Sequence, residues 1–125
     1  MTIQHIEVLV ALISGTHLAS KDSFTHPDFR TYLLDRNDGR RCGGVAVVVR
    51  KGLIHRLLPC PRTRVIEALA IELHLANRQL IVVSAYFPGS SDPLVLSTFR
   101  KDLEVLSDLG PNLLIGGDFN SRYPF

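Results

Sequence analysis

The 125-residue sequence has little cysteine, and this scarcity excludes several classes of protein. Its two cysteines, Cys42 and Cys60, have neither a CxxC spacing nor a histidine pair beside them. Such isolated cysteines argue against a structural zinc site and against a disulfide-stapled scaffold. We therefore expect both thiols to be reduced and the protein to be intracellular, either nuclear or cytoplasmic.

The sequence also has no long apolar run. No stretch approaches the about 20 consecutive apolar residues that a transmembrane helix needs. Residues 8–13 are apolar but follow Glu7, and they lack the basic lead and the small-residue cleavage site of a signal peptide. We expect a core strand there and no membrane partner. Repeats and low-complexity segments are missing too, and the length with 46% hydrophobic residues predicts one packed domain.

The net charge of +2 conceals a strong asymmetry along the chain. Residues 36–64 carry eight basic side chains against one acidic side chain, so this segment is +7. A solvated polar face would account for it, but such clustering favours a polyanionic partner. We select Arg40, Arg41, Arg50 and Lys51 as candidate nucleic-acid-binding residues.

The first expected strand is residues 8–13. Apolar alternation and turn residues predict further strands at 32–34, 45–49, 53–58, 65–75, 80–83 and 112–116. Gly52 lies between two of these runs and predicts a tight hairpin that joins them. One helix is expected after Asp92, which can cap it. Its apolar stripe consists of Leu96, Phe99, Leu103 and Leu106. Antiparallel strands followed by a crossover helix and another strand indicate an α/β or α+β fold.

Two apolar strands end in polar residues. One delivers Gly116, Gly117, Asp118 and Asn120 to its end, and the other ends in Tyr86 before a Pro-Gly turn. Glycines allow close backbone approach, and residues two apart in an extended chain point to the same side. We therefore expect a site on the rim of a sheet. The plainer alternatives are a turn for the Asp-Phe-Asn segment and a core tyrosine with a satisfied hydroxyl.

Four motifs occur in a recognisable order and spacing: Ile13-Ser14-Gly15-Thr16-His17-Leu18, Gly43-Gly44-Val45-Ala46-Val47, Ser84-Ala85-Tyr86-Phe87-Pro88 and Gly117-Asp118-Phe119-Asn120. Together they resemble the endonuclease/exonuclease/phosphatase family. More closely, they are similar to the apurinic-type endonuclease domain of non-LTR retrotransposons of the jockey-like and R1-like kinds. The resemblance implies a two-sheet, four-layer α/β sandwich with its site at one edge. It also implies Mg²⁺-dependent hydrolysis of DNA phosphodiester bonds.

The resemblance assigns roles to three residues. Asp118 would orient or deprotonate the attacking water, Asn120 would hold that aspartate or a phosphate oxygen, and Tyr86 would donate to the phosphate. Mg²⁺ takes oxygen ligands and keeps several waters, so one or two carboxylates suffice. The family's main ligand is a glutamate, and Gly15 occupies its position here. No metal ligand is assigned, and we expect Mg²⁺ binding to be weakened or lost.

The family's first strand, which ends in asparagine, and its late Ser-Asp-His segment have no counterpart in these residues. The resemblance therefore implies that residues 1–125 are a partial domain without the first strand and the C-terminal half, inactive as an isolated chain. A downstream reverse transcriptase domain would be its partner in the full polyprotein.

Two other functions remain open from the sequence. One is a non-catalytic nucleic-acid-binding module that uses the arginine-rich segment 36–64. The other is a member of the same fold that acts on phosphoinositides or sphingolipids. Glu67, on the face of Leu69 and Ile71, is either an ion-pair partner of an arginine or part of the site.

Overall fold

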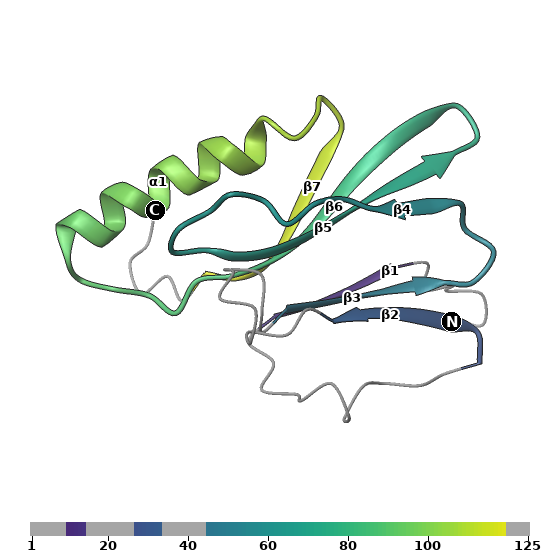
Figure 1. The fold of residues 1–125 in the computed structure, drawn as a ribbon, viewed down its shortest axis with the longest axis horizontal. Helices are drawn as coiled ribbons and strands as arrows, with labels where there is room; N and C mark the ends of the chain where they lie inside the picture. Colours follow the sequence, from purple (N-terminus) through teal and green to yellow (C-terminus); the bar gives the residue numbers. More distant parts are fainter. Residues whose placement is uncertain (1–9, 15–26, 34–44, 120–125) are drawn as a thin grey trace, which may run out of the picture.

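The computed structural model describes residues 10–14, 27–33 and 45–119. The elements in chain order are β1 (Val10–Ser14), β2 (Phe29–Leu33), β3 (Val45–Arg50), β4 (His55–Leu57), β5 (Glu67–Leu75), β6 (Arg78–Tyr86), α1 (Pro93–Ser107) and β7 (Leu113–Asp118). They form a three-stranded sheet of order β1-β3-β2 and a four-stranded sheet of order β4-β5-β6-β7. Figure 1 shows the two sheets one above the other, with α1 on the side of the four-stranded sheet away from the smaller sheet.

The helix packs as its sequence pattern predicts. The Leu94 N–H donates to the Asp92 carboxylate at 2.9 Å, which satisfies one of the unpaired donors at the helix start. Leu106 is fully buried against the sheet, and the rest of the predicted stripe packs beside it. The strands under the helix present small side chains such as Ala68 and Ala70, which belong to the same core cluster as Leu106.

A second core fills the space between the two sheets. It is built mainly from branched aliphatic side chains of β3, β5 and β6: Val45, Val47, Val49, Leu69, Ile71, Leu73 and Val82. Burying each such side chain contributes about 1.5–3 kcal/mol. β5 is covered on one face by α1 and on the other by the small sheet. Its central residues 68–71 are therefore all apolar and buried. The predicted α/β class is confirmed.

The predicted hairpin around Gly52 is wrong. Gly52 has the positive φ expected of it, at 100°, but β3 and β4 belong to different sheets. Both edges of β3 are occupied, by β1 and by β2, so β4 cannot pair with it and pairs with β5 instead. Residues 51–54 therefore carry the chain from one sheet to the other.

The remaining connections follow the predicted pattern. β5 and β6 pair antiparallel across a tight turn, and α1 joins β6 to a parallel β7. Two strands are shorter than predicted: β4 spans only His55–Leu57 of the predicted 53–58, and β5 begins at Glu67 rather than at residue 65. The backbone N–H groups of residues 64–66 donate to the carboxylate of Asp102 instead of to a neighbouring strand.

The cysteine prediction needs correction. Cys60 is disulfide-bonded, so the expectation that both thiols are reduced is wrong for this residue. Cys42 lies outside the described residues. The intracellular assignment consequently loses the observation on which it depended and stays a prediction. Within the described ranges no helix has the length and apolar character needed to cross a membrane.

Candidate functional site

Three polar residues are paired across neighbouring strands at one end of the four-stranded sheet. Tyr86, the last residue of β6, is in register with Asp118, the last residue of β7, and with Glu67, the first residue of β5. Neighbouring strands lie about 4.8 Å apart, so the outer two Cα atoms are about 10 Å apart. Residues directly opposite each other project to the same face. We call Glu67, Tyr86 and Asp118 the rim row.

Local sequence explains why the strands end together here. Pro88 has no N–H and cannot continue the β6 ladder, and the Phe87 N–H makes the last bond, to the Asp118 carbonyl at 2.9 Å. At Gly117 a Cβ atom would lie 1.8 Å from the Ala85 carbonyl oxygen, and φ is +155°. Only glycine permits this close approach, and it holds Asp118 beside Tyr86.

The Tyr86 side chain is half-buried, and its hydroxyl makes no hydrogen bond within the described part of the chain. The Tyr86 ring packs against the core between the sheets, as the alternative of a core tyrosine expects, but no described residue satisfies its hydroxyl. Tyr32 provides the contrast, because its hydroxyl donates to Nε2 of His55 at 2.7 Å. Asp118 is exposed and Glu67 is half-buried, so the rim row has one face open to solvent.

The rim row suits a metal only in a limited way. In the ranges 10–14, 27–33 and 45–119, no three His, Cys, Asp or Glu side chains are grouped so as to hold an ion. Mg²⁺ nevertheless binds through one or two carboxylates together with substrate phosphates and water. The exposed carboxylate of Asp118 meets that requirement when a phosphate supplies further oxygens. Glu67, two strands away, is the other carboxylate on the rung.

Several predicted residues lie elsewhere. Asn120, Gly15, Arg40 and Arg41 are outside the described residues. Arg50 and Lys51 precede β4, whose first residue, His55, pairs with Leu73 at the other end of β5 from the rim row. The six residues from Glu67 to Leu73 span about 20 Å of strand. The structure therefore does not bring Arg50 and Lys51 together with Tyr86 and Asp118.

The sequence does not decide the role of Glu67, and it does not single out the two arginines that directly precede β5. Arg62 and Arg64 directly precede β5 and are both exposed. They belong to the basic segment 36–64, but charge clustering alone gave no reason to prefer them. Their position in the sequence, within five residues of Glu67, indicates that they lie near the rim row once β5 is known to begin at Glu67.

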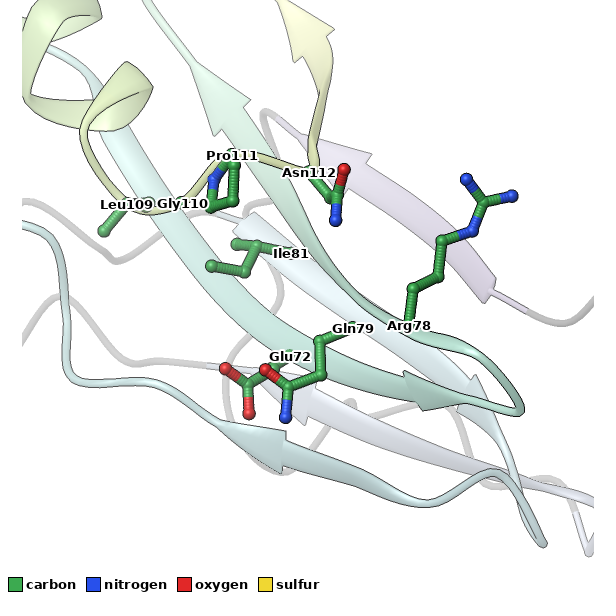
Figure 2. A pocket seen from close by; sticks show the side chains of 8 residues that line it. All are labelled: Glu72, Arg78, Gln79, Ile81, Leu109, Gly110, Pro111 and Asn112. Atoms are coloured by element: carbon green, nitrogen blue, oxygen red, sulfur yellow. The ribbon is translucent and has the colours of Figure 1, made fainter.

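A pocket of about 490 Å³ opens at the opposite end of the strands. Its lining comes from the ends of β5 and β6 and from the α1–β7 connection: Glu72, Arg78, Gln79, Ile81, Leu109, Gly110, Pro111 and Asn112. Figure 2 shows Glu72 and Gln79 extending to one side of the strands and Arg78 to the other. The Glu72 carboxylate already binds Arg56 at 3.3 Å and His74 at 2.9 Å. The pocket and the rim row are separate features.

Comparison with known proteins identifies the fold. No protein family matches the chain, and no curated protein sequence matches it. Among solved structures, the chain is similar to the endonuclease domain of TRAS1, a telomere-specific non-LTR retrotransposon, with a TM-score of 0.62 and 18% identity. The alignment covers 92% of this chain and 48% of that one, so the chain spans about half the length of its structural neighbour. At this identity the likeness establishes a shared mixed α/β fold.

Proposed function

We propose that this chain carries part of a retrotransposon-type endonuclease domain whose rim row contacts the sugar-phosphate backbone of DNA. Residues 1–125 correspond in this proposal to about half of such a domain, since the alignment covers 48% of the solved neighbour. In the complete domain the reaction is hydrolysis of a DNA phosphodiester bond with Mg²⁺. The solved neighbour is itself an endonuclease domain of a non-LTR retrotransposon.

The observation that carries the proposal is the register of Tyr86 with Asp118. Both residues end parallel strands, and ligands of α/β sheets bind beyond the carboxyl ends of such strands. The Tyr86 hydroxyl, without a hydrogen-bond partner in the described residues, can donate to a phosphate oxygen. A pair of this kind supplies a donor for the phosphate and an acceptor for water on one rung.

Each side chain then has a chemical task. In the complete domain the Asp118 carboxylate accepts a hydrogen bond from the attacking water, orients it and takes its proton, while the water oxygen bonds to phosphorus and the bond to the leaving ester oxygen breaks. Tyr86 donates to a non-bridging phosphate oxygen as negative charge develops there. Asn120, two residues beyond Asp118 in the sequence, would hold the aspartate or a second phosphate oxygen. When bound, Mg²⁺ neutralises charge on the phosphate.

We propose that the 125-residue chain binds DNA without cutting it. Gly15 stands where the resemblance requires the principal carboxylate ligand, and no histidine of the described ranges lies on the rim row. Catalytic groups that act as a unit fail together, so losing this principal ligand removes several orders of magnitude in rate. In this proposal the isolated chain therefore behaves as a non-catalytic nucleic-acid-binding module, the alternative function given by the sequence.

The test combines nicking of supercoiled plasmid in Mg²⁺ with equilibrium DNA binding by the purified chain. We expect binding that weakens steeply with salt and no nicking above that of Asp118→Ala. Gly15→Glu alone should not restore cleavage. Nicking that exceeds the Asp118→Ala level would show that the chain is an active endonuclease. A chain that neither binds nor cuts DNA would refute the proposed function.

A further inference from the structure

The segment between β4 and β5, residues 58–66, returns the chain to the edge that holds the rim row. β4 pairs with the far part of β5, so this segment travels back along the sheet before β5 begins at Glu67. In Figure 1 it extends beyond the β4 arrowhead and then turns back into β5. Because it contains Arg62 and Arg64, we call residues 58–66 the arginine loop.

The backbone of the arginine loop is held by the buried carboxylate of Asp102 on α1, which is 2% exposed. Consecutive N–H groups of the loop donate to it: Arg64 at 2.9 Å, Val65 at 2.7 Å and Ile66 at 2.9 Å. Three successive backbone donors around one anion form a nest, here closed by the protein's own side chain. The carboxylate thus binds backbone donors of the loop rather than its arginine side chains.

Further restraints fix the rest of the loop. The Thr63 N–H donates to the Pro61 carbonyl at 2.9 Å, and the Thr63 hydroxyl donates to the Ile66 carbonyl. Cys60 is disulfide-bonded, and a proline lies on each side of it. Prolines and crosslinks reduce the conformational freedom that the loop would otherwise lose on binding a ligand.

Both arginine side chains of this fixed backbone are exposed to solvent. Exposure alternates along the loop: Pro61 and Thr63 are buried, whereas Arg62 and Arg64 are exposed. Neither guanidinium forms an ion pair or hydrogen bond with any residue that the structure describes. Arg56, at the far end, is different because it is bound to Glu72. The loop itself, residues 58–66, contains no acidic residue.

We propose that the arginine loop is a phosphate-binding surface that holds the DNA backbone beside the rim row. The inference rests on the proposed function, and it assigns that function's contacts to Arg62 and Arg64. Arg64 is three residues from Glu67, so at most about 10 Å of chain separates it from the rim row. Guanidinium groups recognise phosphate oxygens through paired N–H donors, and here two of them are carried on a restrained backbone.

The test is the affinity of a fluorescein-labelled DNA duplex for the chain, measured by anisotropy over a series of NaCl concentrations. The variant is Arg62→Ala with Arg64→Ala. The matched control is Arg56→Ala with Arg78→Ala, which removes the same charge from the other end of the sheet. We expect the variant to bind about tenfold or more weakly and to lower the salt slope by about 2. The control should change affinity by less than about threefold.

Arg62→Lys with Arg64→Lys keeps the positive charge but loses the paired donors, so it should recover the salt slope and only part of the affinity. Circular dichroism melting checks that all variants fold. Equal losses of DNA affinity in the variant and the control would overturn the inference, because the net charge of the chain would then explain the binding. Unchanged binding in the variant would also overturn it while the proposed function stands. If the wild-type chain binds phosphatidylserine vesicles but no DNA, both proposals fail.

Discussion

The two ends of the four-stranded sheet are held in different ways. At the rim-row end the structure depends on backbone groups: the nest around Asp102, the close approach at Gly117 and the bond from Phe87 to Asp118. At the far end it depends on side-chain bonds, such as that of Arg56, which is 66% exposed, with Glu72. Backbone restraints fix positions more tightly than long flexible side chains do, because less rotamer freedom must be lost. A phosphate-contacting edge benefits from such rigidity.

The strongest test of this comparison is a pair of glycine substitutions. In Gly117→Ala the new Cβ meets the backbone of Ala85 at 1.8 Å, so β6 and β7 must separate. In Gly110→Ala, near the far-end pocket, the new Cβ meets only the side-chain tip of Ile81 at 2.7 Å. We expect the first change to lower the free energy of unfolding by about 4 kcal/mol and the second by about 1 kcal/mol. Urea denaturation of both variants measures the difference.

If Gly117→Ala unfolds at the same urea concentration as Gly110→Ala, the rim-row end is not held by this backbone contact. Loss of DNA binding in Gly117→Ala should accompany any displacement of Asp118 from Tyr86, since β7 positions the carboxylate. If a folded Gly117→Ala variant binds DNA with unchanged affinity, this glycine contributes to stability but is not needed for DNA binding.

The next test compares two carboxylates. Asp102→Asn removes one acceptor oxygen and the charge from a group that binds three buried or half-buried backbone donors. We expect a loss of about 2–4 kcal/mol, because the donors cannot all be satisfied. Glu72→Gln changes the same chemistry at the far end, where the partner side chains Arg56 and His74 are 66% and 37% exposed. Its cost should be about 1 kcal/mol or less.

Urea denaturation again gives both values, and amide hydrogen exchange locates the effect. Asp102→Asn should speed exchange at Arg64, Val65 and Ile66, whereas Glu72→Gln should leave those amides unchanged. Slow exchange at these amides in Asp102→Asn would mean that the loop holds its shape without the carboxylate, and the nest would then not explain its rigidity.

Local features of the fold were predictable from the sequence. The α1 start follows from Asp92 and Pro93, and its buried stripe follows from a spacing of three and four residues. The strand ends at Tyr86 and Asp118 follow from the proline and glycines beside them. Each of these signals lies within a few residues of the feature that it determines.

Features that depend on distant partners were not predictable. Asp102 is next to Leu103 of the apolar stripe of α1, and nothing in the neighbouring sequence indicates that it is buried. Its hydrogen-bond partners are about 36–38 residues away in the sequence. The pairing of β4 with β5 depends on β3 having both edges occupied. The inclusion of Glu67 in the rim row depends on strand register, which periodicity does not give.

The smallest expected effect distinguishes two tyrosines. At the far end, Nδ1–H of His55 donates to the Leu53 carbonyl, so Nε2 accepts from the Tyr32 hydroxyl and links the two sheets. Tyr32→Phe should therefore cost about 1 kcal/mol. Tyr86→Phe should cost little, because that hydroxyl makes no hydrogen bond within the described residues, but it should weaken DNA binding severalfold. Urea denaturation and anisotropy on both variants separate these effects, and the reverse pattern would assign Tyr86 to the core and Tyr32 to the DNA.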